Sequence, residues 1–568
     1  MSNPKADLIL TNGRVFDAWL PESAVAIHRG RILAVDRPDR VLAEYASPET
    51  QVTDLAGSNV LPGFNDCHMH ILGLGFTLLG ADVRPEAGIR DVPTLIQTLT
   101  RWAAANPGSQ WIRAYGYNQN SFPDARHVTA ADLDKAFPDR PVVLFHASGH
   151  AAVANSAALR AAQIRPTTPD PANGQICRDG FGAPTGVLLE SAVELVTKAI
   201  PALTREERTR AILLAAERLA SMGITSASDM GIGGPHLEDD LAASKAAIAR
   251  GAPLRITLCP DAATLWNPSE IPAPEQLLAE WGLPFGGDAD LVGCVRLGAL
   301  KLYADGALTT RTAALEEPYA DGSGNGMLLL EPEELNRYMA QGHRQGWQLA
   351  VHAIGDRAIE AVLQAYEELE YAGGWASRSH RIEHAMMVTE AMAVRMAALE
   401  VTAVLQPEFL MRLGDAYVLA LGMDRARKLN RSGMLRDLGV RVAFSSDNPV
   451  VPGNPLDGIR AAVVRETPSG QHLGEDHWSV MDGIRAYTAA AAKTVRDTEV
   501  GFVLPSLRAD LSIVSGLPED SWRGLELRLR YGSGRRRGHA AEENQPHVQA
   551  TIVGGKVVFG QLGQERVG

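Results

Sequence analysis

The sequence predicts an α/β protein, a (β/α)8 TIM-like barrel with a small β-sandwich domain built from both chain termini and an inserted cap segment. In the middle of the chain, short apolar strands alternate repeatedly with longer helical segments, which is typical of a barrel. Both ends instead read as short strands joined by tight turns, and 568 residues exceed a single compact core. An open doubly wound sheet is the alternative, but no GxGxxG motif follows the first strand.

The two ends of the chain are expected to form the β-sandwich domain together, from residues 1–60 and 501–568. Near the N-terminus we expect strands at 8–10 and 14–16 with a turn at 11–13 between them. A hairpin signal follows, because His28-Arg29-Gly30 separates two apolar runs. The runs expected as further strands are 24–27, 31–35, 510–514, 550–553 and 556–559.

Residues 61–500 carry the barrel signal, in which a helical segment ends at a glycine or polar residue and an apolar strand follows. Residues 76–210 fit this repeat poorly and are rich in Pro, Gly and polar residues, so we expect an inserted cap over the barrel mouth. The expected helix and strand pairs are 211–222 with 224–227, 332–345 with 348–352, 390–399 with 401–405, and 435–438 with 440–445.

The first barrel strand ends in two histidines separated by one residue, His68 and His70, within Leu61-Pro62-Gly63-Phe64-Asn65-Asp66-Cys67-His68-Met69-His70. Side chains alternate along a strand, so both imidazoles point to one face and make half of a metal site. Cys67 points to the other face and is interpreted as packing.

Further polar residues stand at the ends of later predicted strands, where the chemistry of a barrel is located. These are Lys301, His352, His384 and Asp447. Each alone has an ordinary explanation: a hydrogen-bonded core histidine, a lysine that reaches the surface, or a turn aspartate. Their combination with the histidine pair indicates a metal centre.

With these motifs the sequence resembles the amidohydrolase superfamily of metal-dependent hydrolases, and within it the branch of N-substituted formamide deformylases. The likeness covers nearly the whole chain. It is carried by the histidine pair above and by segments around the later strand ends. These segments are 148–156, Lys301 to Gly306, Val351-His352-Ala353-Ile354-Gly355-Asp356, Arg381-Ile382-Glu383-His384-Ala385 and Ser445-Ser446-Asp447.

The resemblance implies a two-metal centre, with zinc as the metal that best suits histidine ligands. His68, His70 and Asp447 would bind one metal, and His352 and His384 the other. Lys301 would bridge both as a carboxylated lysine. The chemistry of lysine is consistent with this bridging role, because a desolvated lysine loses its proton readily and its neutral amine can add carbon dioxide.

The expected reaction is metal-assisted hydrolysis of an amide-type bond, with Asp447 as acid and base. His150, in the expected cap, would donate to the carbonyl oxygen, with His146 as a competing candidate. Asp305 and Asp356 are expected to orient ligands or cap strand ends. Glu383 precedes His384 on a strand, so it is expected to face away and to be structural.

Composition limits the partners of the protein. The formal charge of −13 argues against nucleic acid or an anionic membrane surface. No apolar stretch reaches membrane-spanning length and no secretory signal is visible, so a cytoplasmic protein is expected. The four cysteines form no CxxC pair, and the arginines at 535–537 indicate an exposed loop. A homodimer is a reasonable expectation for a soluble enzyme.

The expected substrate is a small, N-substituted amide with an apolar or aromatic group. Aromatic residues of the cap and of one strand end could line such a pocket or belong to the core: Trp111, Tyr115, Tyr117, Phe122 and Phe409. One alternative on the same fold is a one-metal deaminase, which the presence of Lys301 disfavours, or a cyclic-amide hydrolase. The other is a metal-binding protein without catalysis.

Overall fold

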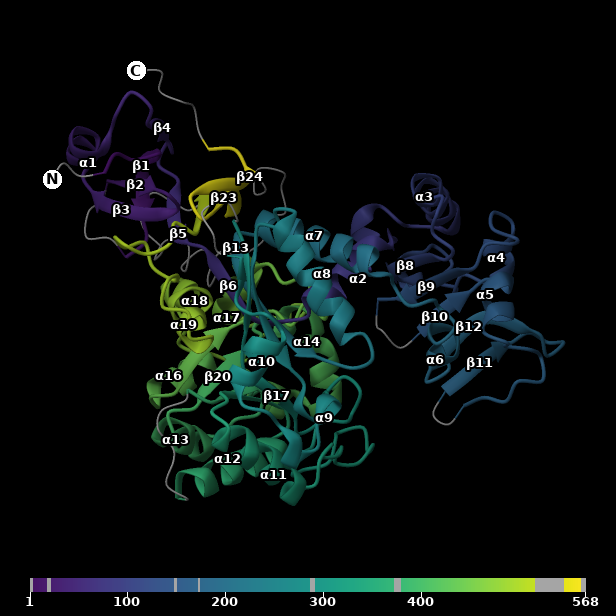
Figure 1. The fold of residues 1–568 in the computed structure, drawn as a ribbon. Helices are drawn as coiled ribbons and strands as arrows, with labels where there is room; N and C mark the ends of the chain where they lie inside the picture. Colours follow the sequence, from purple (N-terminus) through teal and green to yellow (C-terminus); the bar gives the residue numbers. More distant parts are fainter. Residues whose placement is uncertain are drawn as a thin grey trace. The chain divides into compact units, whose positions relative to one another are not determined.

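The computed structural model describes residues 4–17, 22–147, 151–171, 174–286, 292–371, 379–515 and 546–562. The chain divides into two compact units, described separately below (Figure 1). The first unit contains Met1–Ile71 and Ala215–Gly568, and the second contains Leu72–Leu214. The arginines at 535–537 lie outside the described residues. Within the described part, no helix is both long and apolar enough to cross a membrane.

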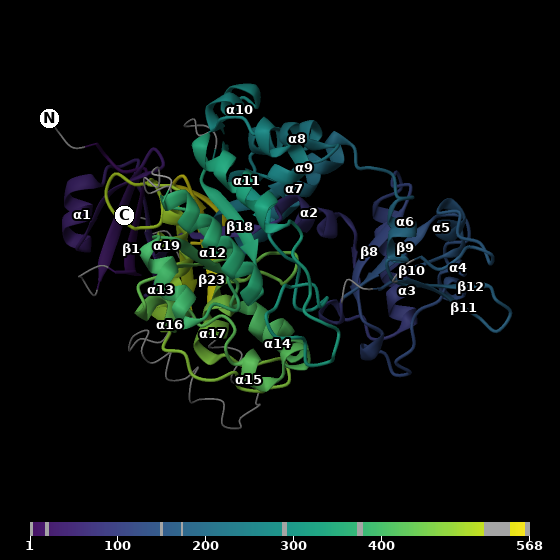
Figure 2. The same ribbon diagram turned by 90° about the horizontal axis from the view of Figure 1, so that it is seen from below.

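Strands from both termini form a single sheet in the first unit, here called the terminal sheet. Its path is β24-β23-β22-β5-β1-β2-β3, with β4 paired to β1. A sandwich of two separate sheets is not confirmed. Helix α1 (Pro38–Tyr45) packs on β1 and β2 (Figure 2). The strands are β1 (Leu8–Val15), β2 (Ser23–His28), β3 (Arg31–Asp36), β4 (Gln51–Asp54), β5 (Asn59–Pro62), β22 (Leu511–Ser515), β23 (His547–Val553) and β24 (Lys556–Gly560).

The turn expected at 11–13 is wrong, because β1 runs through it as one strand. An irregularity between Leu10 and Gly13 shifts the pairing with β2. On its other edge, β1 pairs first with β4 and then, beyond the irregularity, with β5. The polar residues therefore mark a bulge rather than a hairpin turn, and a bulge bends a strand without ending it.

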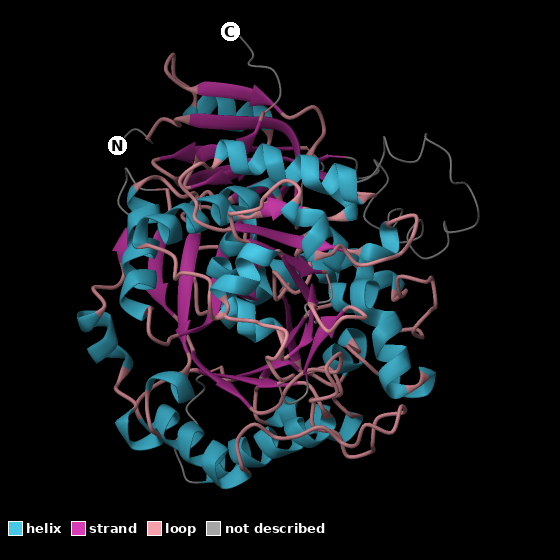
Figure 3. Cartoon of the chain, turned by 90° about the vertical axis from the view of Figure 1, so that its right-hand side faces the viewer, coloured by secondary structure: helices cyan, strands magenta, loops and turns pink. Residues whose placement is uncertain are grey.

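Parallel strands form the core of the first unit, in two sheets of five. Helices lie outside these strands (Figure 3). The chain order of the strands is also their order in space, which gives a TIM-barrel-type arrangement. The strands are β6 (Phe64–Met69), β13 (Ile224–Ile232), β14 (Arg255–Pro260), β16 (Cys294–Leu297), β17 (Leu300–Tyr303), β18 (Leu349–Ala353), β19 (Arg381–His384), β20 (Thr402–Leu405) and β21 (Arg441–Phe444), with the short antiparallel β15 (Phe285–Gly286) at one edge.

The two sheets meet through isolated contacts, and no continuous ladder closes the barrel among the described residues. Between β21 and β6, the Asp447 amide donates to the His68 carbonyl at 2.8 Å. At the other junction, β16 and β17 are separated at Gly298, where a Cβ would lie 2.6 Å from the Cys259 Sγ. A parallel bridge between Asp261 and Lys301 continues the contact beyond that break.

The expected helix and strand pairs of the barrel are confirmed, with ends that differ by a few residues. Helices α11, α12 and α13 follow one another around the strands (Figure 1). Cys67 packs with Val404, Ala443 and Ala491 on the side opposite His68, as expected from strand alternation. The principal helices are α7 (Arg205–Ser221), α8 (Leu237–Ala249), α11 (Pro332–Arg344), α12 (Asp356–Tyr371), α13 (Glu390–Ala398), α14 (Glu408–Leu421), α16 (Ser432–Asp437), α17 (Pro455–Val464), α18 (Val480–Tyr487) and α19 (Ala489–Thr494).

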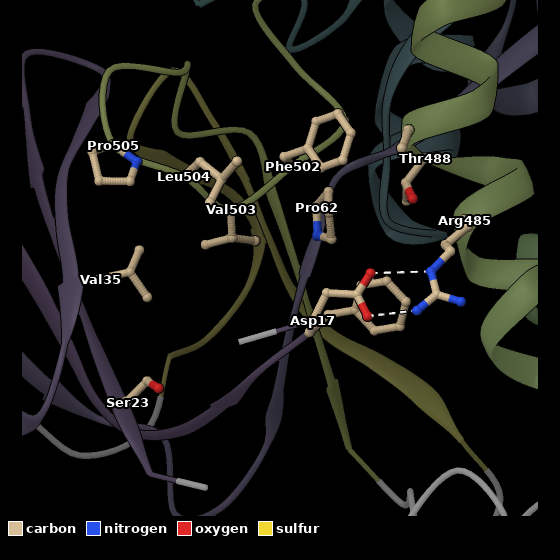
Figure 4. Close-up of a pocket in the computed structure, with 13 residues that line it drawn as sticks. Asp17, Ser23, Val35, Pro62, Arg485, Thr488, Phe502, Val503, Leu504 and Pro505 are labelled. Carbon is tan, nitrogen blue, oxygen red and sulfur yellow. Dashed lines mark hydrogen bonds and ion pairs between the residues drawn. The ribbon is translucent and has the colours of Figure 1, made fainter. Parts of the chain in front are cut away.

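A pocket lies between the terminal sheet and α18 (Figure 4). Its lining is largely apolar, and Asp17 forms a two-point ion pair with Arg485 at 2.7 and 3.1 Å. None of the predicted metal ligands lines this pocket. It therefore belongs to the contact between the terminal sheet and the barrel helices rather than to the predicted site.

The second unit is an ordered domain with its own six-stranded sheet, in the order β11-β12-β10-β9-β8-β7. Trp111, Tyr117 and Phe122 are buried in its core, so they are core residues rather than pocket lining. Its main elements are α2 (Ile71–Leu79), β7 (Ala81–Asp82), α3 (Val92–Ala105), β8 (Ile112–Tyr117), α4 (Ala130–Asp134), β9 (Val142–His146), β10 (Ala151–Ala154), α5 (Ser156–Ala161), β11 (Gly174–Arg178), β12 (Pro184–Glu190) and α6 (Val193–Thr197).

Candidate metal centre

The strand ends of the barrel bring the predicted ligands together. His68 on β6, His384 on β19 and Asp447 after β21 offer ligand atoms that lie within 4.8 Å of one another, and all three residues are buried. The His70 Nε2 is 3.2 Å from the Asp447 Oδ1. The His352 ring centroid is 4.4 Å from that of His384. Residues from β6, β18, β19 and β21 thus converge on one point.

Asp447 stands at the centre of this group in a left-handed backbone conformation, with a φ of 58°. Its Oδ1 lies 3.4 Å from the His68 Nε2 and 3.2 Å from the His70 Nε2, and neither contact is a well-formed hydrogen bond. Burial acts to raise the pKa of Asp447, but the facing histidines outweigh it and hold the pKa well below its usual range. The carboxylate is therefore ionised and has an oxygen open to a cation.

Lys301 is completely buried, and its Nζ has no hydrogen-bond partner within the described part of the chain. Burial lowers the pKa of Lys301 to about 8, although Glu383 and Asp447 favour the charged form. The amine lies 4.7 Å from the centre of the Tyr303 ring. Burying an amine without a hydrogen-bond partner costs free energy. The Lys301 amine therefore needs a partner that the described side chains do not supply.

Hydrogen bonds select one nitrogen on each of three histidines. The His68 Nδ1 lies 2.5 Å from the Glu383 carboxylate, and the His384 Nδ1 lies 2.8 Å from the Gln406 Oε1. On His352 the bonded nitrogen is Nε2, 3.0 Å from the Gly306 carbonyl. Because these partners are acceptors, the bonded nitrogen carries the proton and the other keeps its lone pair.

The electrostatics of the site keep two of these imidazoles, those of His68 and His384, neutral. Burial, followed by the nearby Lys301, lowers the pKa of His68. Burial, followed by His352 and His68, lowers the pKa of His384 well below its usual value. Neutral imidazoles with open nitrogens, an ionised carboxylate and an unpaired lysine form a donor set that suits a divalent metal such as zinc.

Glu383 has a role that the sequence interpretation missed. It was expected to be structural only, yet its Oε2 accepts from the His68 Nδ1, and both side chains are buried. Its other oxygen contacts the Nε of Arg381, and the Nη2 of Arg381 donates to the Cys67 carbonyl at 3.0 Å. Glu383 does lie behind the candidate ligands, but its hydrogen bond orients one of them, His68. A buried Arg-x-Glu in an apolar strand is the signal that could have indicated this.

The two other acidic residues singled out from the sequence hold loops at the strand ends. Asp305 accepts from the Ile354 and Gly355 amides at 3.0 and 2.9 Å, and its Oδ1 lies 3.4 Å from the His352 Nε2. Asp356 begins α12 and accepts from the Glu316 amide at 2.9 Å. Both therefore order the segments beside His352.

Asp66 ties the first strand to the segment that carries Asp447. It accepts from the Ser446 amide at 3.0 Å and contacts the Ser446 hydroxyl. Burial raises the pKa of Asp66 to about 7, while the bonds from Ser446 act in the opposite direction. Asp66 is thus a structural link between the segment that carries His68 and the segment that carries Asp447.

Two aromatic residues also flank the centre. Phe409 at the start of α14 stacks on the His384 ring with centroids 6.2 Å apart. Tyr303, two residues after Lys301, lies 5.6 Å from the His352 ring, and burial raises its pKa above its usual value. His150 lies outside the described residues. The competing His146 ends β9, where its ring meets that of Tyr117 at 5.1 Å inside the second unit.

Comparisons with known proteins place the chain among metal-dependent hydrolases. The model of the amidohydrolase family matches residues 51–559. YtcJ of Bacillus subtilis, named as an amidohydrolase, is 33% identical over 87% of this chain and 91% of its own. The N-substituted formamide deformylase of Arthrobacter pascens is 29% identical over 92% of this chain and 95% of its own.

A solved structure supports the same assignment. An uncharacterized metal-dependent hydrolase from Pyrococcus furiosus aligns with a TM-score of 0.69 and 28% identity. The alignment covers 88% of this chain and 97% of the other. The likeness therefore extends over most of both chains.

Proposed function

The chain belongs to the amidohydrolase family and acts on carbon–nitrogen bonds other than peptide bonds, and we propose that its substrate is a small N-substituted amide. The observation that carries this proposal is the convergence of the buried His68 and His384, whose pKa values are lowered, on an ionised Asp447, with an unpaired lysine nearby. The likeness to an N-substituted formamide deformylase favours a formamide with an apolar or aromatic substituent.

We propose that the centre holds two divalent metals, zinc by preference. His68, His70 and Asp447 would hold one, and His352 and His384 the other. The open nitrogens support this division: Nε2 of His68 and His384, and Nδ1 of His352. A divalent metal in such a site supplies Lewis acidity, which acidifies water and polarises a carbonyl group.

Lys301 would bridge the two ligand sets as a carbamate. Its neutral amine adds to the carbon of carbon dioxide, and the resulting carbamic acid loses a proton. This converts a nitrogen that cannot bind a cation while protonated into a group with two oxygen donors. The absence of any hydrogen-bond partner for the Nζ among the described residues supports this chemistry, because a carbamate on a metal would satisfy the buried group.

Asp447 moves the proton in the proposed reaction. Its carboxylate accepts a proton from the attacking water as the water oxygen bonds to the carbonyl carbon. It then delivers that proton to the leaving nitrogen as the carbon–nitrogen bond breaks, releasing an amine and a carboxylic acid. The two facing histidines, His68 and His70, lie 3.4 and 3.2 Å from the carboxylate and lower its pKa, which favours the ionised form for the first step.

A one-metal deaminase on the same fold is the second candidate. The buried lysine separates the two, because a single metal held by histidines and Asp447 needs no bridging group. The two-metal amidohydrolase accounts for the burial of Lys301, whereas the deaminase leaves it unexplained.

The test is metal content per chain by elemental analysis, with amidase activity measured on the same samples. The variants are wild type, Lys301→Ala and, as a control, Lys556→Ala on the exposed edge of the terminal sheet. The panel contains N-alkyl and N-aryl formamides and acetamides. We expect about two metals in wild type and in the control, falling together with activity in Lys301→Ala. One metal in active wild type, unchanged in Lys301→Ala, would favour the deaminase.

A further inference from the structure

Tyr303 stands beside the metal centre without a role in the mechanism above. It follows Lys301 by two residues on β17, so both side chains point to the same face of the strand. The centre of its ring is 4.7 Å from the Lys301 Nζ and 5.6 Å from the His352 ring centroid. The phenol is thus placed against two of the predicted metal ligands.

The hydroxyl of Tyr303 has no hydrogen-bond partner within the described part of the chain. Two buried tyrosines of the first unit give theirs to backbone carbonyls. Tyr366 donates to Arg381 at 3.1 Å, and Tyr338 donates to Trp266 at 3.0 Å. Tyr366 and Tyr338 are buried, and a buried phenol normally finds such a partner, whereas Tyr303 is only half-buried and its hydroxyl stays accessible to a ligand. Tyr303 has kept its hydroxyl available.

The opposing strand leaves room for this hydroxyl. Gly231, near the end of β13, has a φ of 79°, and a Cβ there would lie 2.3 Å from the Tyr303 hydroxyl oxygen. The next nearest atom of the phenol, its Cζ, would be 3.4 Å away. The glycine therefore accommodates the oxygen in particular, and an alanine would displace it.

We propose that the Tyr303 hydroxyl donates a hydrogen bond to the carbonyl oxygen of the substrate. This inference rests on the proposed amide hydrolysis. As water adds to the carbonyl carbon, the electron pair of the double bond moves onto that oxygen, and the phenol stabilises the resulting negative charge. The tyrosine keeps its proton throughout. When the carbon–nitrogen bond breaks, the carbonyl double bond forms again and the hydrogen bond weakens.

The arrangement fits the requirement for such a donor. A donor is most effective when it is fixed before the reaction and aimed where charge develops. The Tyr303 ring is held by its position on the strand, and its hydroxyl has no competing acceptor. The donor also comes from the barrel that carries Asp447, so water attack and charge stabilisation would be organised by one unit.

The first experiment compares Tyr303→Phe with Tyr338→Phe, a control that removes a buried hydroxyl on α11. The probe is the amide of the panel that wild type hydrolyses fastest. We expect Tyr303→Phe to lower kcat by about 10²- to 10³-fold with KM little changed, as for other lost oxyanion donors. Metal content and thermal midpoint should match wild type. A phosphonamidate analogue of the same amide, which mimics the tetrahedral intermediate, should bind more weakly to the variant.

The second experiment asks whether Gly231 acts through the hydroxyl. Gly231→Ala should lower kcat in wild type, and it should cost clearly less in the Tyr303→Phe background, where the 2.3 Å clash is gone. An equal loss of kcat in both backgrounds would mean that Gly231 is needed only for its positive φ and not for the space it leaves to the hydroxyl. This result would count against the proposal.

Other outcomes are decisive in different ways. If Tyr303→Phe keeps wild-type kcat, or loses activity only together with metal, the hydrogen-bond role is overturned while amide hydrolysis stands. If wild type hydrolyses no amide of the panel, the proposed function fails first and this role fails with it. Tyr338→Phe should retain wild-type activity in either case.

Discussion

Histidines lie near both ends of strands β18 and β19, and the two groups are bonded differently: His343 on α11 and His380 just before β19 lie at the N-terminal end, and His352 on β18 and His384 on β19 at the C-terminal end. At the N-terminal end, the His343 Nδ1 lies 2.9 Å from the His380 Nε2, and the His380 Nδ1 accepts from the Leu349 amide. His380 also stacks on Tyr366 with ring planes 9° apart. At the C-terminal end, His352 and His384 each bond one nitrogen to the protein and leave the other open.

The difference shows how one residue type serves two purposes on the same strands. A histidine whose nitrogens are bonded within the protein contributes packing and hydrogen bonds. A histidine with one nitrogen bonded and one open is oriented for a ligand. This division follows the general rule that the C-terminal face of a barrel carries chemistry and the N-terminal face carries stability.

The largest expected effect on activity comes from replacing Asp447, which lies at the C-terminal end of the barrel strands. Asp447→Asn keeps the shape of the side chain but cannot accept the water proton, so kcat should fall by about 10²- to 10⁴-fold. The measurement is kcat with metal content on the same samples. Asp457→Asn on α17, at an exposed ion pair with Arg412, is the control and should be close to wild type. An active Asp447→Asn with full metal would exclude Asp447 as the base.

A second prediction concerns Glu383, which orients His68. Glu383→Gln leaves an acceptor for the His68 Nδ1 but removes the charge that faces Arg381. We expect metal affinity to fall by about 10- to 100-fold, measured by competition with a chelator. Glu367→Gln, which removes a similar arginine partner on the exposed face of α12, should leave affinity unchanged. Equal affinities in the two variants would reduce Glu383 to a structural residue.

The histidine pair at the N-terminal end of the barrel strands, His343 and His380, should affect stability and not metal binding. His380→Leu removes the partner of His343 and the acceptor of the Leu349 amide. The free energy of unfolding should fall by about 1–3 kcal/mol, as for other buried hydrogen bonds that lose a partner. Urea unfolding of the metal-free protein measures this loss. Metal content per folded chain should equal that of wild type, and a decrease would contradict the division between the two ends.

The smallest expected effect is a pH dependence of stability that arises from histidines at the C-terminal end of the barrel strands. The pKa values of His68 and His384 are lowered in the folded protein, so the unfolded chain binds more protons below pH 6.5. The contribution of these two histidines to the stability of the metal-free protein should therefore be complete above pH 6.5 and be lost as the pH decreases, whereas Asp66, with its pKa raised to about 7, contributes in the opposite direction. In His384→Leu this dependence should be shallower, as urea unfolding at several pH values would show. An identical slope would place the titrating groups elsewhere.

Much of the fold and the composition of the candidate site could be predicted from local patterns. Periodicity located the strand–helix repeats, and the polar residue at the end of each strand indicated His68, Lys301, His384 and Asp447. The terminal sheet was also expected from strand signals at both ends. The single sheet and the bulge near Gly13 could not be predicted, because a polar turn signal looks the same whether a strand bends or reverses.

The sequence by itself determined which side chains reach the C-terminal end of the barrel, because strand alternation and strand ends are local properties. Only the tertiary structure decided what those side chains meet. Glu383 reaches His68 across 315 positions of the chain, and the Tyr303 hydroxyl meets Gly231 on another strand. Such contacts depend on how distant strands are arranged around the barrel, and no local pattern along the chain records that arrangement.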